Sequence, residues 1–243
     1  MMNSNLVKYI LTSHQRVFLF SHMRSRSSLL SHIIGSHPDI SGYYEFQQHY
    51  FSKKSMLKQK LSHAWHEKFD VKNSKYMFDK ILHNDIIVDD NVLLNPNNFF
   101  IFMLRSPNST IPSMLEMGKR KGESSPFNKL EHCEKYYFER LKKLQSLASS
   151  IKHSFHYINA ETIVNQPEET LKNLSLYLEL NLPLSQEYKL MNKTGKASFG
   201  DTSRNINSGK ILKSTNSLPN AYLNSELTLE YEKLDSKLSK QSR

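Results

Sequence analysis

The residues from Val17 to Glu45 constrain the fold most, because apolar, polar and helical patterns follow one another within them. Val17–Phe20 are all apolar and are typical of a short buried strand. The polar run Ser21–Ser28 contains two arginines, and Ser27 or Ser28 is well placed to cap a helix. That helix is indicated by apolar residues at helical spacing, namely Leu29, Leu30, Ile33 and Ile34. A strand, a hydroxyl-rich turn and a helix offer free N–H groups and a positive helix end to an anion, so the stretch predicts a phosphate-type loop.

Length and composition are those of an ordinary globular chain. The 243 residues are 38% hydrophobic and 11% aromatic, which is enough for one domain with a core. We expect a single domain over residues 1–218 and an amphipathic, polar tail over 219–243. In that tail leucine repeats at Leu223, Leu227, Leu234 and Leu238. The single cysteine, Cys133, excludes an internal disulfide framework and a zinc site of several cysteines.

The chain is expected to act in the cytoplasm. No run of about 18 apolar residues is present, so we expect no membrane span. Residues 1–16 hold one lysine and no long apolar stretch, which argues against a signal peptide. With 33 basic and 23 acidic residues the net charge is +10, which favours anionic partners such as nucleotides, phosphorylated or sulfated molecules, nucleic acid or anionic lipid. The basic residues are scattered, so charge alone does not choose among these partners.

Further strands alternate with helices along the chain. Strand patterns cover 76–80, 99–104 and 155–158, and helical patterns cover 47–69, a stretch from about 108, 129–150, 161–164 and 168–180. Residues 192–218 have little periodicity and are expected to form a surface loop. The alternation predicts an α/β fold, a three-layer sandwich with a mainly parallel central sheet. Ligands of such sheets bind at the carboxyl ends of the strands, where Arg24–Ser28, Lys80 and Arg105 fall.

Two groups of residues could bind phosphate. In the loop, backbone amides, serine hydroxyls and arginines would hold it, because the GxxxxGK[ST] pattern of ATP and GTP hydrolases is absent. Arg105 could offer a bidentate fork to a second phosphate, and Ser113 could add a hydroxyl. The alternatives are a polar turn whose serines only cap a helix, and a surface arginine near a solvated serine.

Four motifs in the same order resemble sulfotransferases that use 3′-phosphoadenosine 5′-phosphosulfate (PAPS). The segment RSRSSLL, Arg24–Leu30, is similar to their 5′-phosphosulfate loop, and Gly35–Ile40 resembles the segment after that loop in tyrosylprotein and related bacterial sulfotransferases. Phe102–Ser113 looks like their 3′-phosphate motif, and Tyr157–Leu180 is similar to a later stretch of the family. The resemblance covers roughly residues 16–212 and implies a P-loop-like nucleotide-binding fold.

The resemblance also implies roles for particular residues. Glu45 would act as the base, and Arg24 and Lys80 would stabilise charge on the bridging oxygen during transfer. Arg105 and Ser113 would hold the 3′-phosphate of PAPS. The 5′-phosphosulfate would be held by Arg24, Ser25, Arg26, Ser27, Ser28 and Leu29. No metal is implied.

Three details are particular to this chain. Arg26 stands where the family loop usually has glycine, so it needs a tolerable φ or a different bend. Met23 and Arg24 replace the usual lysine-rich variant of the loop. Lys210 in the late loop would close over the nucleotide.

The base, the acceptor and the function class leave alternatives open. Rival bases are His22, His37 and His49. The acceptor would bind between the segments 46–75 and 115–130, and it could be a small molecule, a glycan, a lipid or a peptide with a hydroxyl or an amine. Nucleic acid is not an expected partner, and the oligomeric state is left open. The other functions are a nucleotide kinase with a degenerate loop, and a non-catalytic basic module that binds nucleotides, RNA or an anionic glycan.

Overall fold

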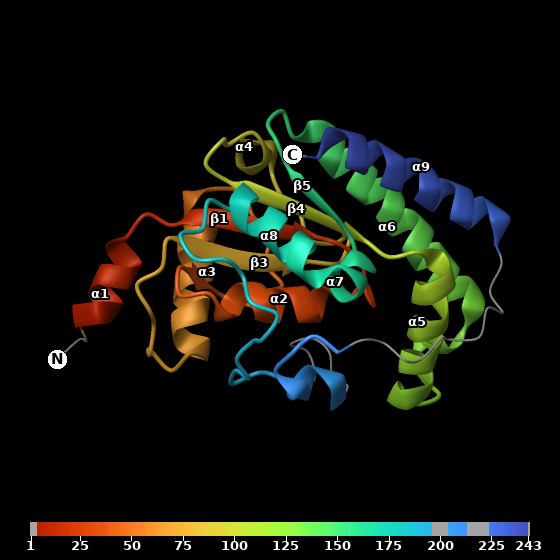
Figure 1. The fold of residues 1–243 in the computed structure, drawn as a ribbon, viewed down its shortest axis with the longest axis horizontal. Coiled ribbons are helices and arrows are strands. Elements are labelled where there is room, and N and C mark those ends of the chain that lie inside the picture. Colours follow the sequence, from red (N-terminus) through yellow and green to blue (C-terminus); the bar gives the residue numbers. More distant parts are fainter. Residues whose placement is uncertain (1–3, 196–203, 213–223, 243) are drawn as a thin grey trace.

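The computed structural model describes residues 4–195, 204–212 and 224–242, and its centre is a parallel sheet with helices on both faces (Figure 1). The sheet has five strands in the order β2-β3-β1-β4-β5, and every strand pair is parallel. The strands are β1 (Gln15–Phe20), β2 (Ile40–Ser41), β3 (Tyr76–Ile81), β4 (Phe99–Leu104) and β5 (His156–Asn159). The predicted α/β class with a mainly parallel sheet is confirmed.

Helices alternate with these strands as the sequence predicts. They are α1 (Ser4–Leu11), α2 (Ser27–Ser36), α3 (Lys53–His66), α4 (Asp90–Leu93), α5 (Pro107–Lys121), α6 (Leu130–Ser150), α7 (Thr162–Asn165), α8 (Pro167–Tyr177) and α9 (Ser225–Gln241), with 3-10 turns at Pro126–Asn128 and Arg204–Ser208. The sequence patterns do not predict α1 or α4. Within the described ranges, no helix combines the length and the apolar character that crossing a membrane requires.

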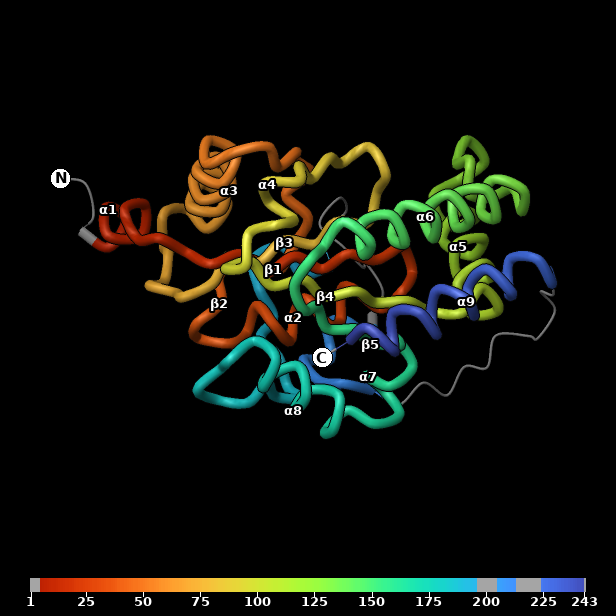
Figure 2. The backbone as a smooth tube through the Cα atoms, turned by 90° about the horizontal axis from the view of Figure 1, so that it is seen from above, coloured from red at the N-terminus to blue at the C-terminus, as the bar shows by residue number. Residues whose placement is uncertain are grey.

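The apolar strands bury side chains on both faces of the sheet. Phe18 and Phe20 of β1 belong to the larger core cluster, which α5, α6 and α9 cover. Val17 and Leu19 belong to a second cluster under α2 and α8. Because successive strand residues point to opposite faces, a continuous apolar strand requires a helical layer on each side. The predicted three-layer sandwich is confirmed, and Figure 2 shows α1 and α3 at one end of it and α5, α6 and α9 at the other.

The segment expected to form a tail contains α9, which begins at Ser225 and packs against the main core. The side chains of Leu227, Tyr231, Leu234 and Leu238 are buried in the larger cluster, and α9 lies along α6 (Figure 1). The sequence pattern left the docking of this helix open, and the structure places it on the same core as the rest of the domain. Leu223 and the other residues of 219–223 lie outside the described residues.

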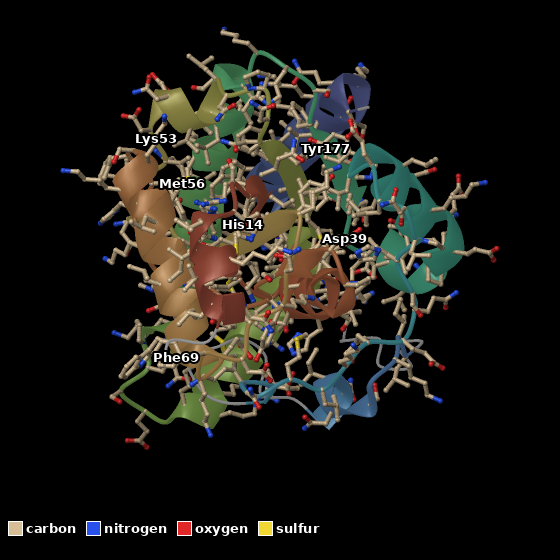
Figure 3. All side chains as sticks on the ribbon, turned by 90° about the vertical axis from the view of Figure 1, so that its left-hand side faces the viewer. His14, Asp39, Lys53, Met56, Phe69 and Tyr177 are labelled. Atoms are coloured by element: carbon tan, nitrogen blue, oxygen red, sulfur yellow. The ribbon has the colours of Figure 1, made fainter. Side chains whose placement is uncertain are left out.

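The helix predicted over 47–69 is shorter in the structure, where α3 lies along one flank with Lys53 at its amino end (Figure 3). Before it, Tyr50 is extended: its N–H donates to the Ile87 carbonyl at 2.8 Å, and its carbonyl accepts from the Asp89 N–H at 2.8 Å. Gln47 has a φ of 51°, outside the right-handed helical region. The chain therefore enters the helix only after it has paired with the segment that follows β3.

The strand order places one crevice at the carboxyl edge of the sheet. From β1 the chain continues to β2 and β3 on one side, and it then crosses to β4 and β5 on the other. The loops that follow β1 and β4 therefore diverge, and such a switch point is where parallel α/β sheets bind ligands. The phosphate-type loop and Arg105 border this crevice.

Candidate active site

The loop after β1 ends at a helix that no side chain caps. The N-cap of α2 is Arg26, which makes no side-chain cap hydrogen bond, so the expectation that Ser27 or Ser28 caps this helix is wrong. Ser27 is instead the first helical residue. The first turn of a helix has N–H groups without intrahelical acceptors and carries partial positive charge. The N terminus of α2 thus offers Ser27, Ser28 and Leu29 N–H groups to an anion.

Two arginines of this loop have left-handed backbone conformations. Arg24 has a φ of 62° and Arg26 a φ of 67°. This conformation costs a residue with a Cβ atom about 1–2 kcal/mol relative to the right-handed region. Arg26 therefore adopts the backbone that a glycine would supply at this position, and the loop keeps a charged side chain there at some cost in stability.

The serine hydroxyls of the loop are used mainly to fix its shape. Ser25 is buried and donates to the His22 carbonyl at 2.7 Å. Ser21 donates to the Met103 carbonyl at 2.6 Å, which ties the loop to β4. Ser27 is also buried, whereas the hydroxyl of Ser28 accepts a hydrogen bond from Lys80 at 3.3 Å. Ser28 is thus the loop serine whose hydroxyl meets another predicted site residue.

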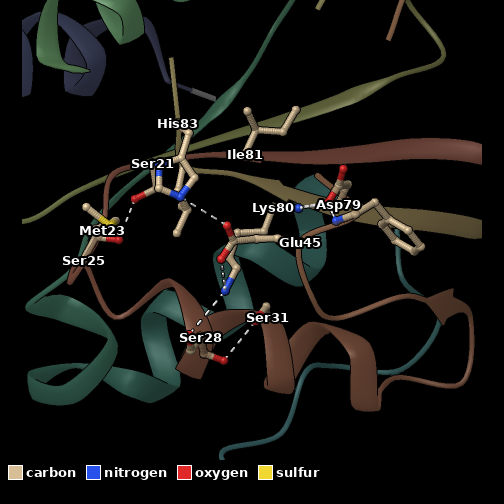
Figure 4. Close-up of polar contacts among 12 residues, drawn as sticks. Ser21, Met23, Ser25, Ser28, Ser31, Glu45, Asp79, Lys80, Ile81 and His83 are labelled. Atoms are coloured by element: carbon tan, nitrogen blue, oxygen red, sulfur yellow. Dashed lines mark hydrogen bonds and ion pairs between the residues drawn. The ribbon is translucent and has the colours of Figure 1, made fainter. Parts of the chain in front are cut away.

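Glu45 and Lys80, which lie far apart in the sequence, come together beside Ser28 (Figure 4). Lys80 Nζ lies 3.4 Å from Glu45 Oε1, and the Lys80 side chain is almost fully buried at the end of β3. His83 approaches the other carboxylate oxygen of Glu45, with Nε2 at 3.7 Å from Oε2. No sequence pattern points to His83, although it lies just beyond the end of the strand that carries Lys80.

Asp79 fixes the segment that carries Glu45. Its carboxylate accepts hydrogen bonds from the Phe46 N–H at 3.0 Å and from the Tyr50 hydroxyl at 2.5 Å. Burial raises the pKa of Asp79 to about 7, and the nearby charge of Glu45 acts in the same direction. Because adjacent residues of β3 point to opposite faces, Asp79 anchors this segment from one side while Lys80 contacts Glu45 from the other.

Arg105 and Ser113, the pair expected at the 3′-phosphate, are linked through Arg24. Arg24 Nε donates to Ser113 Oγ at 3.0 Å, and the Arg24 carbonyl accepts from Arg105 Nη1 at 3.1 Å. Glu161, two residues after β5, then joins Arg105 to Arg26. Its Oε1 accepts from Arg105 Nε at 3.0 Å, and its Oε2 lies 2.8 Å from Arg26 Nη2. The ends of β1, β4 and β5 and the helix α5 therefore contribute to one polar group at the switch point.

The three histidines named as rival bases occupy different environments. His22 is fully buried, its Nε2 accepts from the Arg105 N–H at 3.0 Å, and burial lowers its pKa to about 3. His37 has both ring nitrogens engaged, with the Leu182 carbonyl and the Asp39 N–H. These two histidines therefore hydrogen-bond to backbone groups and fix the chain around them. The low pKa of His22 means that its ring is neutral. His49 accepts from the Ile87 N–H at 3.2 Å and lies beside the cavity next to Glu45.

A cavity of about 630 Å³ opens next to Glu45. Its lining includes Glu45, Gln48, His49, Lys80, His83, Tyr136 and Glu139. Of the two segments expected to hold the acceptor, 46–75 contributes only its first residues to this lining, and 115–130 contributes none. The segment after β3 and the face of α6 form the remaining wall, because the crossing of α6 over the strand ends brings them beside Glu45.

Two other predicted residues lie apart from these contacts. Leu29 packs against the second core cluster, so its contribution to an anion site is its backbone N–H. Lys210 forms an antiparallel bridge with Glu187, and its side chain is exposed. Among the described residues, no hydrogen bond or ion pair joins the Lys210 side chain to the phosphate-type loop.

Arg140, to which no sequence motif points, supports the site from behind. Its side chain is 1% exposed and donates to the carbonyls of Ser21 (2.8 Å), Ile81 (2.6 Å) and His83 (3.1 Å). These carbonyls end β1 and β3, so Arg140 holds the two strand ends that carry the loop and Lys80. Its position within the apolar stripe of a long helix is the sequence feature that could have indicated a buried, functional arginine.

The parallel sheet and the helices that cover it have the fold of sulfotransferase domains. The sulfotransferase domain from the curacin biosynthetic pathway matches with a TM-score of 0.62 and 20% identity over 93% of this chain and 98% of that domain. The sulfotransferase domain from the Synechococcus PCC 7002 olefin synthase matches with a TM-score of 0.58 and 17% identity over 93% and 94%. No protein-family model and no curated protein matches the sequence itself. At these identities the likeness establishes the fold.

Proposed function

We propose that the chain transfers a sulfuryl group from PAPS to an acceptor hydroxyl or amine. The observation that carries the proposal is the meeting of Lys80, Glu45 and Ser28 beside the uncapped N terminus of α2. A helix N terminus flanked by arginines favours a phosphate-type anion. A carboxylate next to a buried lysine and a cavity is suited to taking a proton from a bound group. The sulfotransferase fold supports the same function.

The chain offers two groups of donors to the co-substrate, which supplies an activated sulfuryl group when bound. The first-turn N–H groups of α2, with Arg24 and Arg26, would hold the 5′-phosphosulfate. Arg105 and Ser113 would hold the 3′-phosphate, with Arg24 between them. Because Arg26 Nη1 is buried and no described residue accepts a hydrogen bond from it, the loop already contains a donor suited to an anion. The residues present therefore fit this co-substrate.

Glu45 would take the acceptor's proton as the acceptor oxygen or nitrogen bonds to sulfur. The bond between sulfur and the bridging phosphate oxygen breaks in the same step, so the electron pair leaves with adenosine 3′,5′-bisphosphate. Lys80, which reaches both Ser28 and Glu45, would stabilise the negative charge on that departing oxygen. His83, 40% exposed, is placed to pass the proton from Glu45 to water.

The cavity beside Glu45 is the proposed acceptor site. Its volume of about 630 Å³ lies in the range of pockets that hold small molecules or one segment of a larger ligand. Its lining is mainly polar side chains, which suits an acceptor with several hydrogen-bonding groups. A glycan, a polar small molecule and a peptide side chain all meet this requirement.

The test is transfer of labelled sulfate from PAPS to a panel of hydroxyl and amine acceptors. We expect formation of adenosine 3′,5′-bisphosphate that depends on the acceptor, and its loss by at least about 100-fold in Glu45→Gln. The bisphosphate should bind Glu45→Gln as it binds the wild type, because Glu45 faces the acceptor cavity. Glu116→Gln, which changes an exposed glutamate outside the lining of this cavity, is the matched control and should keep most of the transfer rate. Equal transfer by Glu45→Gln and wild type would exclude Glu45 as the base.

A further inference from the structure

We propose that Glu161 is the positioning residue of the co-substrate site: its carboxylate holds Arg26 and Arg105 side by side, so that Arg26 directs donors at the 5′-phosphosulfate and Arg105 directs donors at the 3′-phosphate of one bound co-substrate. This inference rests on the proposed function, because it names the residue that prepares the proposed site. It assigns no contact between Glu161 and the co-substrate itself.

The contacts of Glu161 divide evenly between the two arginines. Oε1 accepts from Arg105 Nε at 3.0 Å, and Oε2 lies 2.8 Å from Arg26 Nη2. Arg105 is held a second time, through Nη1, by the Arg24 carbonyl at 3.1 Å. Glu161 and the Arg24 carbonyl therefore hold the Arg105 guanidinium through Nε and Nη1, and Glu161 holds that of Arg26 through Nη2. These contacts use neither Arg105 Nη2 nor Arg26 Nη1, which can donate to a ligand.

A second observation points to a ligand at this place. Arg26 Nη1 is buried and has no hydrogen-bond partner among the residues that the structure describes, although the side chain as a whole is 15% exposed. A buried N–H of a charged group is unfavourable unless an acceptor is present. An anion bound at the N terminus of α2, for which Arg26 is the N-cap residue, would supply that acceptor.

The charges explain why a carboxylate is needed beside this site. Burial lowers the pKa of Arg26, Glu161 raises it, and the charge of Arg105 lowers it. Without Glu161 the two guanidiniums would repel each other across a half-buried site, and their side chains would move apart. With it, the group formed by Arg24, Arg26, Arg105 and Glu161 keeps a positive net charge and a fixed geometry, which favour an anion with more than one charge.

The Glu161 side chain does not cap the helix α7, although its position in the sequence would allow this. It is the N-cap residue of α7, but its side chain makes no cap hydrogen bond there. Its backbone is held separately, because its N–H donates to Asn159 Oδ1 at 3.1 Å. The Glu161 side chain is 36% exposed. The side chain is thus committed to the two arginines.

The experiment is calorimetric binding of adenosine 3′,5′-bisphosphate and of inorganic pyrophosphate to wild type, Glu161→Gln and Glu161→Asp. We expect the dissociation constants of both ligands to rise roughly tenfold in Glu161→Gln, the size that loss of a supporting partner has at other preorganised sites. Glu161→Asp keeps the charge but is too short to reach both arginines, and it should weaken binding as well. The matched control is Glu116→Gln, which removes an exposed ion pair with Arg120 and should leave binding unchanged.

A double-mutant comparison separates positioning from a general structural role. In a chain that carries Arg26→Met and Arg105→Met, Glu161→Gln should have no further effect on binding. Thermal melting shows that each variant is folded. Unchanged dissociation constants with a lower melting temperature would reduce Glu161 to a structural residue, and tighter binding by Glu161→Gln would mean that its carboxylate occupies the anion's place. Either result overturns the inference.

The two ligands distinguish failure of this inference from failure of the proposed function. If pyrophosphate binds in a Glu161-dependent way and the bisphosphate does not bind, the positioning role stands and PAPS use is excluded. If neither ligand binds the wild type, the arginines form no anion site and the inference fails too.

Discussion

At the scale of single residues, Arg26 has both an unfavourable backbone conformation and a charged side chain that forms an ion pair. It adopts a φ of 67°, and its side chain reaches Glu161. We expect Arg26→Gly to be more stable than Arg26→Ala by about 1 kcal/mol, because glycine adopts this φ without a Cβ clash. Both variants lose the same ion pair, so their difference in free energy of unfolding, measured with urea, isolates the backbone term. An alanine variant as stable as the glycine variant would mean that the loop can take a different φ.

The site residues that the sequence predicts are those whose position follows from the sheet. Lys80 and Arg105 lie at or just after strand ends, and parallel strands bring such ends to one edge. The pairing of side chains does not follow from the sheet. Nothing in the spacing shows that Arg24 would separate Arg105 from Ser113, or that Glu161 would bridge two arginines, because these contacts depend on the rotamers of long side chains.

At the scale of elements, Arg140 joins α6 to the ends of β1 and β3. Its guanidinium satisfies carbonyls of Ser21, Ile81 and His83. We expect Arg140→Met to lower the free energy of unfolding by about 3 kcal/mol, because buried carbonyls lose their donors. Lys135→Met, on the exposed face of the same helix, should stay within about 0.5 kcal/mol of wild type. Chemical denaturation of both variants tests this, and similar losses in the two would contradict the role of Arg140.

The packing of α9 against the core predicts which of its leucines contribute to the stability of the fold. Leu238 is fully buried in the larger core cluster, whereas Leu229 on the same helix is 50% exposed. Leu238→Ala should cost about 2–5 kcal/mol in free energy of unfolding, and Leu229→Ala less than about 1 kcal/mol. Equal effects would mean that α9 does not contribute to the core in solution.

For α3 the sequence pattern predicts the helix but not which face of the helix is buried. Its apolar spacing predicts a helix correctly, yet Leu57, Leu61 and Trp65 are exposed. The buried face carries polar residues that find specific partners. Lys60 donates to carbonyls at the end of α1, and His63 Nδ1 lies 3.0 Å from the Tyr9 hydroxyl. Periodicity measures hydrophobicity alone, so it cannot anticipate a face that is buried through hydrogen bonds.

At the scale of the whole molecule, buried histidines make the fold sensitive to acid. Burial lowers the pKa of His22 and His63 to about 3 and that of His14 to about 4, from an ordinary value of 6.5. Below pH 6.5 the unfolded chain binds protons at these rings and the folded chain does not. The stability they contribute is therefore present above pH 6.5 and is lost as the pH falls toward 4 and 3.

Asp79 changes the pH dependence of stability in the opposite direction to the histidines. Burial raises its pKa from 3.8 to about 7, so the stability linked to its proton is present below about pH 4 and is lost as the pH rises through 7. We expect the three histidines to outweigh it, so that the free energy of unfolding falls between pH 6.5 and pH 4. Each histidine contributes about 1.4 kcal/mol per pH unit to that slope.

Urea unfolding over this pH range measures the slope. His63→Gln should make this slope shallower, and Asp79→Asn should make it steeper. A free energy of unfolding that stays constant from pH 6.5 to pH 4 would contradict neutral, buried histidines.

The most direct test of the proposed activity is calorimetric titration with adenosine 3′,5′-bisphosphate beside AMP and ADP, for wild type, Arg105→Ala and the exposed control Arg120→Ala. We predict micromolar binding of the bisphosphate alone. Its affinity should be unchanged in Arg120→Ala and should fall roughly 30- to 1000-fold in Arg105→Ala, the effect of losing a charge-assisted contact of about 2–4 kcal/mol. Weak and equal binding of all three nucleotides would contradict a PAPS site and favour a basic binding module. A preference for ADP that requires Mg²⁺ would favour a kinase.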